Sequence, residues 1–66
     1  MSTKLEILRA LEAMHLQYPE WRFGQMVANI SYMALGPKAE AIWDIEDEQF
    51  LKAMRDHLAD KGVSQA

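Results

Sequence analysis

Two proline-containing breaks, Tyr18-Pro19 and Gly36-Pro37, constrain most strongly how this chain can fold. Proline has no amide donor, and the residue before it is pushed out of the helical region, so helices end ahead of both breaks. On either side of the breaks, apolar residues recur at helical spacing. The sequence therefore predicts a small all-α domain, a single domain over 1–66, with helices at about 4–17, 20–35 and 47–61, an irregular, partly helical segment between the second and third helices, and a frayed tail at 63–66.

The chain of 66 residues is near the lower limit for a domain that folds unaided. Scaffolds of this size usually gain stability from disulfides, a metal or a partner subunit. The absence of cysteine excludes disulfides and thiolate zinc sites, and the two histidines, His15 and His57, cannot form a metal site without carboxylates. We therefore expect no cofactor, and a homo-oligomer (a dimer) or an unidentified protein partner.

The charge balance is seven basic against ten acidic residues, a net charge of −3. This balance disfavours binding to nucleic acid, which requires clustered lysine and arginine. The first residues contain no signal-peptide hydrophobic region, and the longest uncharged stretch, 23–37, is too short to span a bilayer. We expect a cytoplasmic protein without a membrane partner.

The first predicted helix opens with Thr3-Lys4-Leu5-Glu6, a capping-box pattern. Leu5 and Leu16 fall outside its apolar side, so they are either shoulder contacts or a second exposed apolar edge. The apolar side contains Ile7, Leu11, Met14 and Tyr18, with Leu8 on its flank, whereas Glu6, Arg9 and Ala13 face away.

The second predicted helix is almost free of charge, so we expect it to lie centrally, covered on more than one side. Gly24, Ala28 and Ser31 form a strip of small residues that would let another backbone come close. The broad apolar face beside this strip contains Phe23, Met26, Val27, Ile30, Met33 and Ala34.

The third predicted helix is amphipathic, and its apolar quadrant contains Phe50, Leu51, Met54 and Leu58. Before it, residues 38–43 are expected to form a short helical turn. Of the two tryptophans, Trp21 and Trp43, we expect one in the core and the other partly exposed at an interface.

Two candidate sites have simple structural explanations. Carboxylates cluster at Asp44, Glu46, Asp47 and Glu48, but the pattern of an EF-hand loop is missing, and helix N-termini attract carboxylates for capping and dipole reasons alone. His15 and His57 lie at the edges of apolar faces, where a histidine is usually a packing residue with one hydrogen bond. The sequence therefore predicts neither a metal site nor catalytic residues.

The polar strip Arg22, Gln25, Asn29 and Tyr32 on the second helix admits two interpretations. In the internal interpretation, which we favour, the amides bond to the turn after Gly36 and Arg22 pairs with an acid near 44–48. In the external interpretation, the strip faces a partner protein, because tryptophan, tyrosine and arginine are frequent at interfaces. The candidate residues are Arg22, Gln25, Asn29, Glu46 and Asp47 for a structural polar network, and Trp21, Tyr32 and Trp43 for an interface.

The segments Tyr-Pro-Glu-Trp-Arg-Phe-Gly-Gln-Met-Val-Ala-Asn (18–29) and Trp-Asp-Ile-Glu-Asp-Glu-Gln-Phe-Leu (43–51) resemble a group of short bacterial helical proteins. That group has an Arg-x-Gly-Gln…Asn helix, a later Ile-Glu-Asp segment and no assigned activity. The resemblance covers about residues 18–58 and implies no reaction. It implies that Arg22, Gly24, Gln25, Asn29, Glu46 and Asp47 belong to one recurring design.

Together these patterns predict a non-enzymatic protein-interaction module that self-associates. The alternative is a small nucleic-acid-linked regulator of the helix-turn-helix type, which would need a basic recognition face. A small enzyme would need a site assembled across a dimer from the histidines and the acids.

Overall fold

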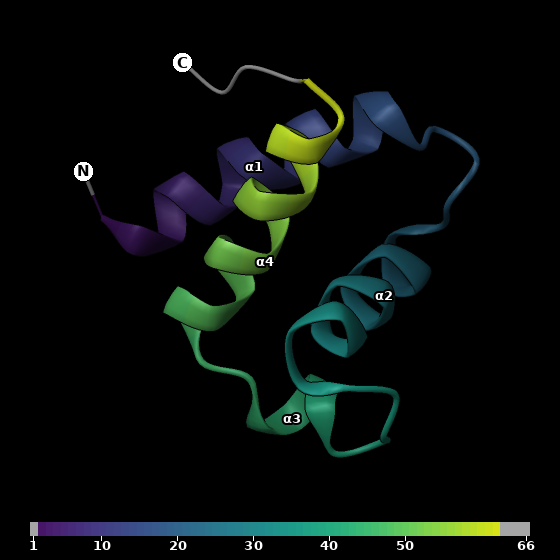
Figure 1. The fold of residues 1–66 in the computed structure, drawn as a ribbon, viewed down its shortest axis with the longest axis vertical. Helices are drawn as coiled ribbons and strands as arrows, with labels where there is room; N and C mark the ends of the chain where they lie inside the picture. The colour runs from purple at the N-terminus through teal and green to yellow at the C-terminus, as the bar shows by residue number, and fades with distance from the viewer. Residues whose placement is uncertain (1, 63–66) are drawn as a thin grey trace.

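The computed structural model describes residues 2–62, which form four helices. They are α1 (Thr3–Gln17), α2 (Phe23–Leu35), α3 (Ala41–Asp44) and α4 (Asp47–Asp60), and Figure 1 shows them in one view. The described part of the chain contains no strand. The predicted all-α fold is therefore confirmed, and α3 is the helical part of the irregular segment between the second and third long helices. The predicted frayed tail, 63–66, lies outside the described residues.

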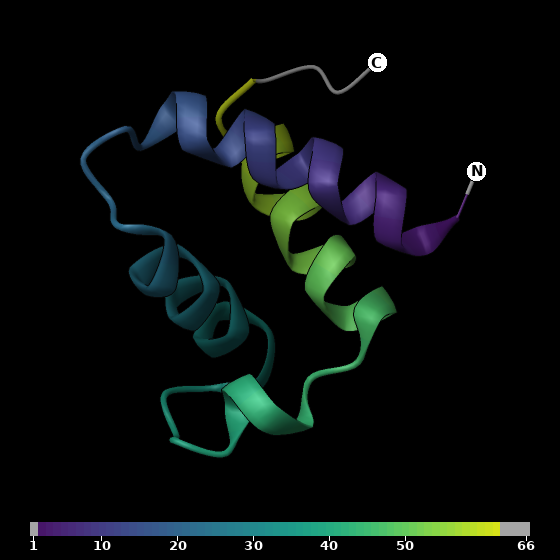
Figure 2. The same ribbon diagram turned by 180° about the vertical axis from the view of Figure 1, so that it is seen from behind.

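α4 is the helix on which both other long helices pack. α1 crosses one side of α4, α2 lies along another, and α3 packs against α2 (Figures 1 and 2). The expectation that the second helix is covered on more than one side is confirmed, since α3 and α4 both contact it, but α4 rather than α2 is the central helix. The physical reason is that the apolar arc of α4 is wide enough to contact two helices, because Leu51 faces the α1 side and Ala53 faces the α2 side.

The hydrophobic core lies where α1, α2 and α4 meet. All four residues of the predicted apolar quadrant of α4 are buried: the side chains of Leu51, Met54 and Leu58 are less than 9% exposed, and Phe50 is 9% exposed. This prediction is therefore confirmed. Methionine fills much of the remaining core, as expected of a flexible side chain that adapts to irregular gaps. The buried cluster contains Ala10 and Met14 from α1, Met26 and Ile30 from α2, and Phe50, Leu51, Met54 and Leu58 from α4.

The starts of α1 and α2 differ from the prediction. Ser2, not Thr3, is the N-cap of α1, and its Oγ accepts a hydrogen bond from the Leu5 amide at 3.2 Å. α2 begins at Phe23 rather than at 20, because the chain after α1 makes a turn in which the Trp21 amide donates to the Tyr18 carbonyl at 3.1 Å. In this turn the Trp21 ring stacks on the Tyr18 ring, with centroids 4.1 Å apart. The stacked rings belong to this turn, which takes the place of the first residues of the predicted helix.

Some of the predicted helix faces also need correction. Ala13 was expected to face away from the core, but it packs against it, because the contact line of α1 is centred on Ala10 and Met14. Phe23 was placed on the apolar face of the second helix, yet it is 67% exposed at the first position of α2. A Cβ added to Gly24 would meet no atom within 4 Å, so no backbone comes close to it within the chain.

Candidate functional site

Among residues 2–62, the shortest tertiary polar contact joins the C-cap residue of α1 to α4. The Tyr18 hydroxyl lies 2.6 Å from Nε2 of His57, 39 residues away in the sequence. Both side chains are half-buried, and the ring of Trp21 stacks on the ring of Tyr18. His57 is therefore a packing residue with one hydrogen bond, as predicted for a histidine at this boundary. Its partner was not predicted, because no local pattern links two positions so far apart.

His15 lies apart from this contact. It is exposed on α1, and its side chain makes no hydrogen bond within residues 2–62. Ser31, the one serine inside a described helix, is fully buried, and its hydroxyl donates to the Val27 carbonyl at 2.8 Å. That hydroxyl is thus committed to the α2 backbone and is not placed to act as a nucleophile.

Within the polar strip on α2, one side chain makes a local hydrogen bond and others are exposed to solvent. Gln25 caps its own helix, because its Oε1 accepts a hydrogen bond from the Arg22 amide at 2.9 Å. Arg22 and Gln25 are exposed, and Asn29 is half-buried. No hydrogen bond or ion pair among residues 2–62 joins Arg22, Gln25 or Asn29 to Glu46 or Asp47.

The acidic segment before α4 repeats the capping arrangement of α2. Glu46 is the N-cap of α4, and its amide donates to Oε1 of Gln49 at 2.9 Å. Asp47 and Glu48 occupy the first turn, where negative charge is favourable to the helix dipole. Within residues 2–62, no three histidine or carboxylate side chains gather as a metal site would require.

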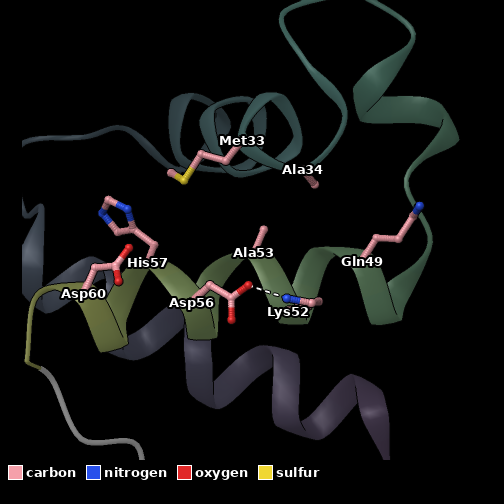
Figure 3. A pocket seen from close by; sticks show the side chains of 8 residues that line it. All are labelled: Met33, Ala34, Gln49, Lys52, Ala53, Asp56, His57 and Asp60. Carbon is pink, nitrogen blue, oxygen red and sulfur yellow. Dashed lines mark hydrogen bonds and ion pairs between the residues drawn. The ribbon is translucent and has the colours of Figure 1, made fainter.

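The α2–α4 groove is an open cleft of about 430 Å³ and is shown in Figure 3. Met33 and Ala34 of α2 form one side, and Ala53 and His57 of α4 lie opposite them. Two of the three charged residues that line it form a pair, since Nζ of Lys52 lies 2.5 Å from a carboxylate oxygen of Asp56, and Asp60 is the third. The groove therefore holds no concentration of one charge that would select an ionic ligand.

The basic residues of α4 do not form a basic face. Lys52 pairs with Asp56, and Arg55 lies 3.9 Å from a carboxylate oxygen of Glu6 on α1. A recognition helix for nucleic acid presents lysine and arginine to phosphates without such competition. The geometry gives the helix-turn-helix alternative no support.

The three candidate interface aromatics lie in different surroundings. Trp21 packs against the core on Tyr18, and Tyr32 is half-buried. Trp43, on the short helix α3, is 90% exposed. The structure thus decides between the two tryptophans, with Trp21 against the core and Trp43 at the surface.

A second groove, between α1 and α2, is mostly apolar and encloses about 280 Å³. Its walls come from Leu8 and Leu11 on α1 and from Phe23 and Met26 on α2. Leu8 and Phe23 are 60% and 67% exposed, respectively, so this groove opens onto an apolar surface. Large exposed apolar side chains also occur elsewhere, at Leu5, Leu16, Met33, Ile42 and Trp43.

No family model matches the chain, and neither a curated protein nor a solved structure matches it. The resemblance to short bacterial helical proteins therefore stays a prediction. No helix within residues 2–62 has the length and apolar character needed to cross a membrane.

Proposed function

We propose that this chain is a cytoplasmic, non-enzymatic protein-interaction module that self-associates. The observation that supports the proposal is the balance between exposed and buried apolar side chains. Leaving aside Ala10 and Ala41, seven apolar residues are buried among the described residues, and seven large apolar residues are exposed. A chain that leaves as many large apolar groups in water as it buries gains stability when a second surface covers some of them.

The small size of the core gives a second reason for association. Domains of this length usually need an additional source of stability, and this chain has no cysteine for disulfides. The lack of cysteine also fits the reducing cytoplasm. Covering exposed leucines in a dimer supplies that stability without a cofactor.

We also propose that the two motifs shared with the short bacterial proteins are helix starts. Arg22 and Gln25 open α2, and Glu46 and Gln49 open α4, in each case through a glutamine that accepts from the amide three residues before it. A helix start of this kind requires no reaction, so this proposal fits a resemblance that implies none.

Light scattering coupled to size-exclusion chromatography tests self-association over a concentration series from low to high micromolar. We expect the mass to rise from that of the 7.6 kDa chain to twice that value as the concentration rises. A chain that stays monomeric at the highest concentration, with full thermal stability, contradicts the proposal.

A further inference from the structure

The outward face of α1 carries four exposed residues in a regular order. Leu5, Arg9, Glu12 and Leu16 are separated by four, three and four positions. At 3.6 residues per turn they fall within an arc of about 60°, on the side of α1 away from Ala10 and Met14. We call these four residues the outer stripe of α1. Its two leucines are 53% and 74% exposed, respectively.

The outer stripe is self-complementary when its direction is reversed. Its order along α1 is apolar, basic, acidic, apolar. If a second α1 lies antiparallel about a two-fold axis between residues 10 and 11, Leu5 lies opposite the partner's Leu16. The same axis places Arg9 opposite the partner's Glu12. A closed two-fold dimer uses one patch on both chains, and this patch satisfies that requirement.

We propose that a second copy of this chain docks on the outer stripe, with the two α1 helices antiparallel. This inference rests on the self-association proposed above and identifies its surface. Two leucine contacts lie at the ends of the stripe, about 16 Å apart along the helix, and two ion pairs lie between them. A parallel pair would instead place arginine against arginine and glutamate against glutamate, which repel.

The charges of the stripe are available for such pairing. The side chains of Arg9 and Glu12 make no hydrogen bond or ion pair within residues 2–62, and both residues are exposed. By contrast, Glu6 on the same helix already lies near Arg55 of α4. Leu8 and Phe23, beside the stripe, extend the apolar surface on one side.

The small surface that one helix pair offers favours a weak dimer. A single helix pair is at the small end of protein interfaces, so the dissociation constant is expected to be on the order of micromolar. The ion pairs are exposed, so raising the salt concentration weakens the dimer.

Charge reversal tests the arrangement through sedimentation equilibrium of the full chain. In Arg9→Glu, both ion pairs of the dimer become repulsive, so we expect the dissociation constant to rise about tenfold. Glu12→Arg should weaken the dimer similarly. The double variant Arg9→Glu/Glu12→Arg restores both pairs with the order reversed and should recover wild-type association.

Mixing the two single variants gives a sharper result. In a mixed dimer, every facing pair at positions 9 and 12 is of opposite sign, so Arg9→Glu and Glu12→Arg should associate with each other more tightly than either does with itself. Lys4→Glu is the matched control, because it makes the same charge change at an exposed position of α1 outside the stripe. It should leave the dissociation constant unchanged.

The outcomes separate the two proposals. A wild-type chain that is monomeric throughout the series overturns self-association, and the stripe with it. A wild-type dimer that Arg9→Glu does not weaken, or a double variant that stays weak, overturns the stripe alone. Leu16→Ala keeps every charge and shortens an exposed side chain of the stripe. If this variant loses the dimer while circular dichroism shows unchanged helix content, the stripe is supported. If the dimer is unchanged, the stripe is contradicted.

Discussion

At the scale of single residues, two glycines have opposite roles in α2. Gly24 lies in the first turn with open space around it, whereas Gly36 ends the helix with φ at +95°. We expect Gly24→Ala to raise the free energy of unfolding by about 0.4–1 kcal/mol, because alanine restricts the unfolded chain. Gly36→Ala should lower it by about 1–3 kcal/mol, because side chains rarely adopt that backbone conformation. Urea denaturation of both variants measures the difference, and a destabilising Gly24→Ala would contradict the open surroundings.

The contact between Tyr18 and His57 gives a second prediction at this scale. Tyr18→Phe keeps the ring stacked on Trp21 but removes the hydroxyl, so the free energy of unfolding should fall by about 1 kcal/mol. Tyr32→Phe is the control, since the Tyr32 hydroxyl makes no hydrogen bond within residues 2–62. Equal losses in the two variants, measured by chemical denaturation, would show that the contact adds no stability.

At the scale of elements, α3 is a single short helix that presents Trp43 to solvent. Trp21→Phe leaves Trp43 as the sole tryptophan, and Trp43→Phe leaves Trp21. Acrylamide should quench the fluorescence of the first variant more strongly, because Trp43 is 90% exposed and Trp21 packs against the core. Trp43→Phe should change the free energy of unfolding by no more than about 0.5 kcal/mol. A protected Trp43 would indicate that α3 is covered in solution.

α1 has one face that packs against the core and an opposite face that carries the outer stripe. Its inner line, centred on Ala10 and Met14, packs against the core, and its outer stripe remains uncovered. The narrow inner line explains why Leu5 and Leu16 find no place in the core. Of the two roles open to them from the sequence, a second exposed edge is the one that the structure shows.

At the scale of the whole molecule, stability depends on very few side chains. A domain of this length has a free energy of unfolding of about 3–10 kcal/mol. Met54 is fully buried in α4, and Met54→Ala should cost about 2–5 kcal/mol, which is a large share of that stability. Leu16→Ala, at an exposed position, should cost no more than about 0.5 kcal/mol when the monomer is measured. Thermal melts at concentrations well below the dissociation constant of the dimer compare the two, and similar losses would show that the core is not where the structure places it.

Much of the local structure of the chain can be predicted from the amino-acid sequence alone. The all-α class, the end of the first helix at Gln17, the end of the second at Leu35 and the buried quadrant of α4 all follow from proline breaks and helical periodicity. These features depend on residues close together in the chain, so the sequence pattern predicts them. The capping of α2 and α4 by glutamine is also local, but the sequence pattern first suggested Gln25 as a partner for the distant turn.

The tertiary structure alone decided which apolar residues stay in water. The crossing of α1 over α4 selects Ala13 for the core and leaves Leu8 outside, and the turn after α1 places Trp21 on Tyr18. It also brings Tyr18 to His57 across 39 positions. No local sequence pattern predicts these contacts, because each depends on where a second helix packs. The spacing of the outer stripe is a property of the sequence, but its exposure depends on the tertiary structure, in which Ala10 and Met14 on the opposite side of α1 pack into the core.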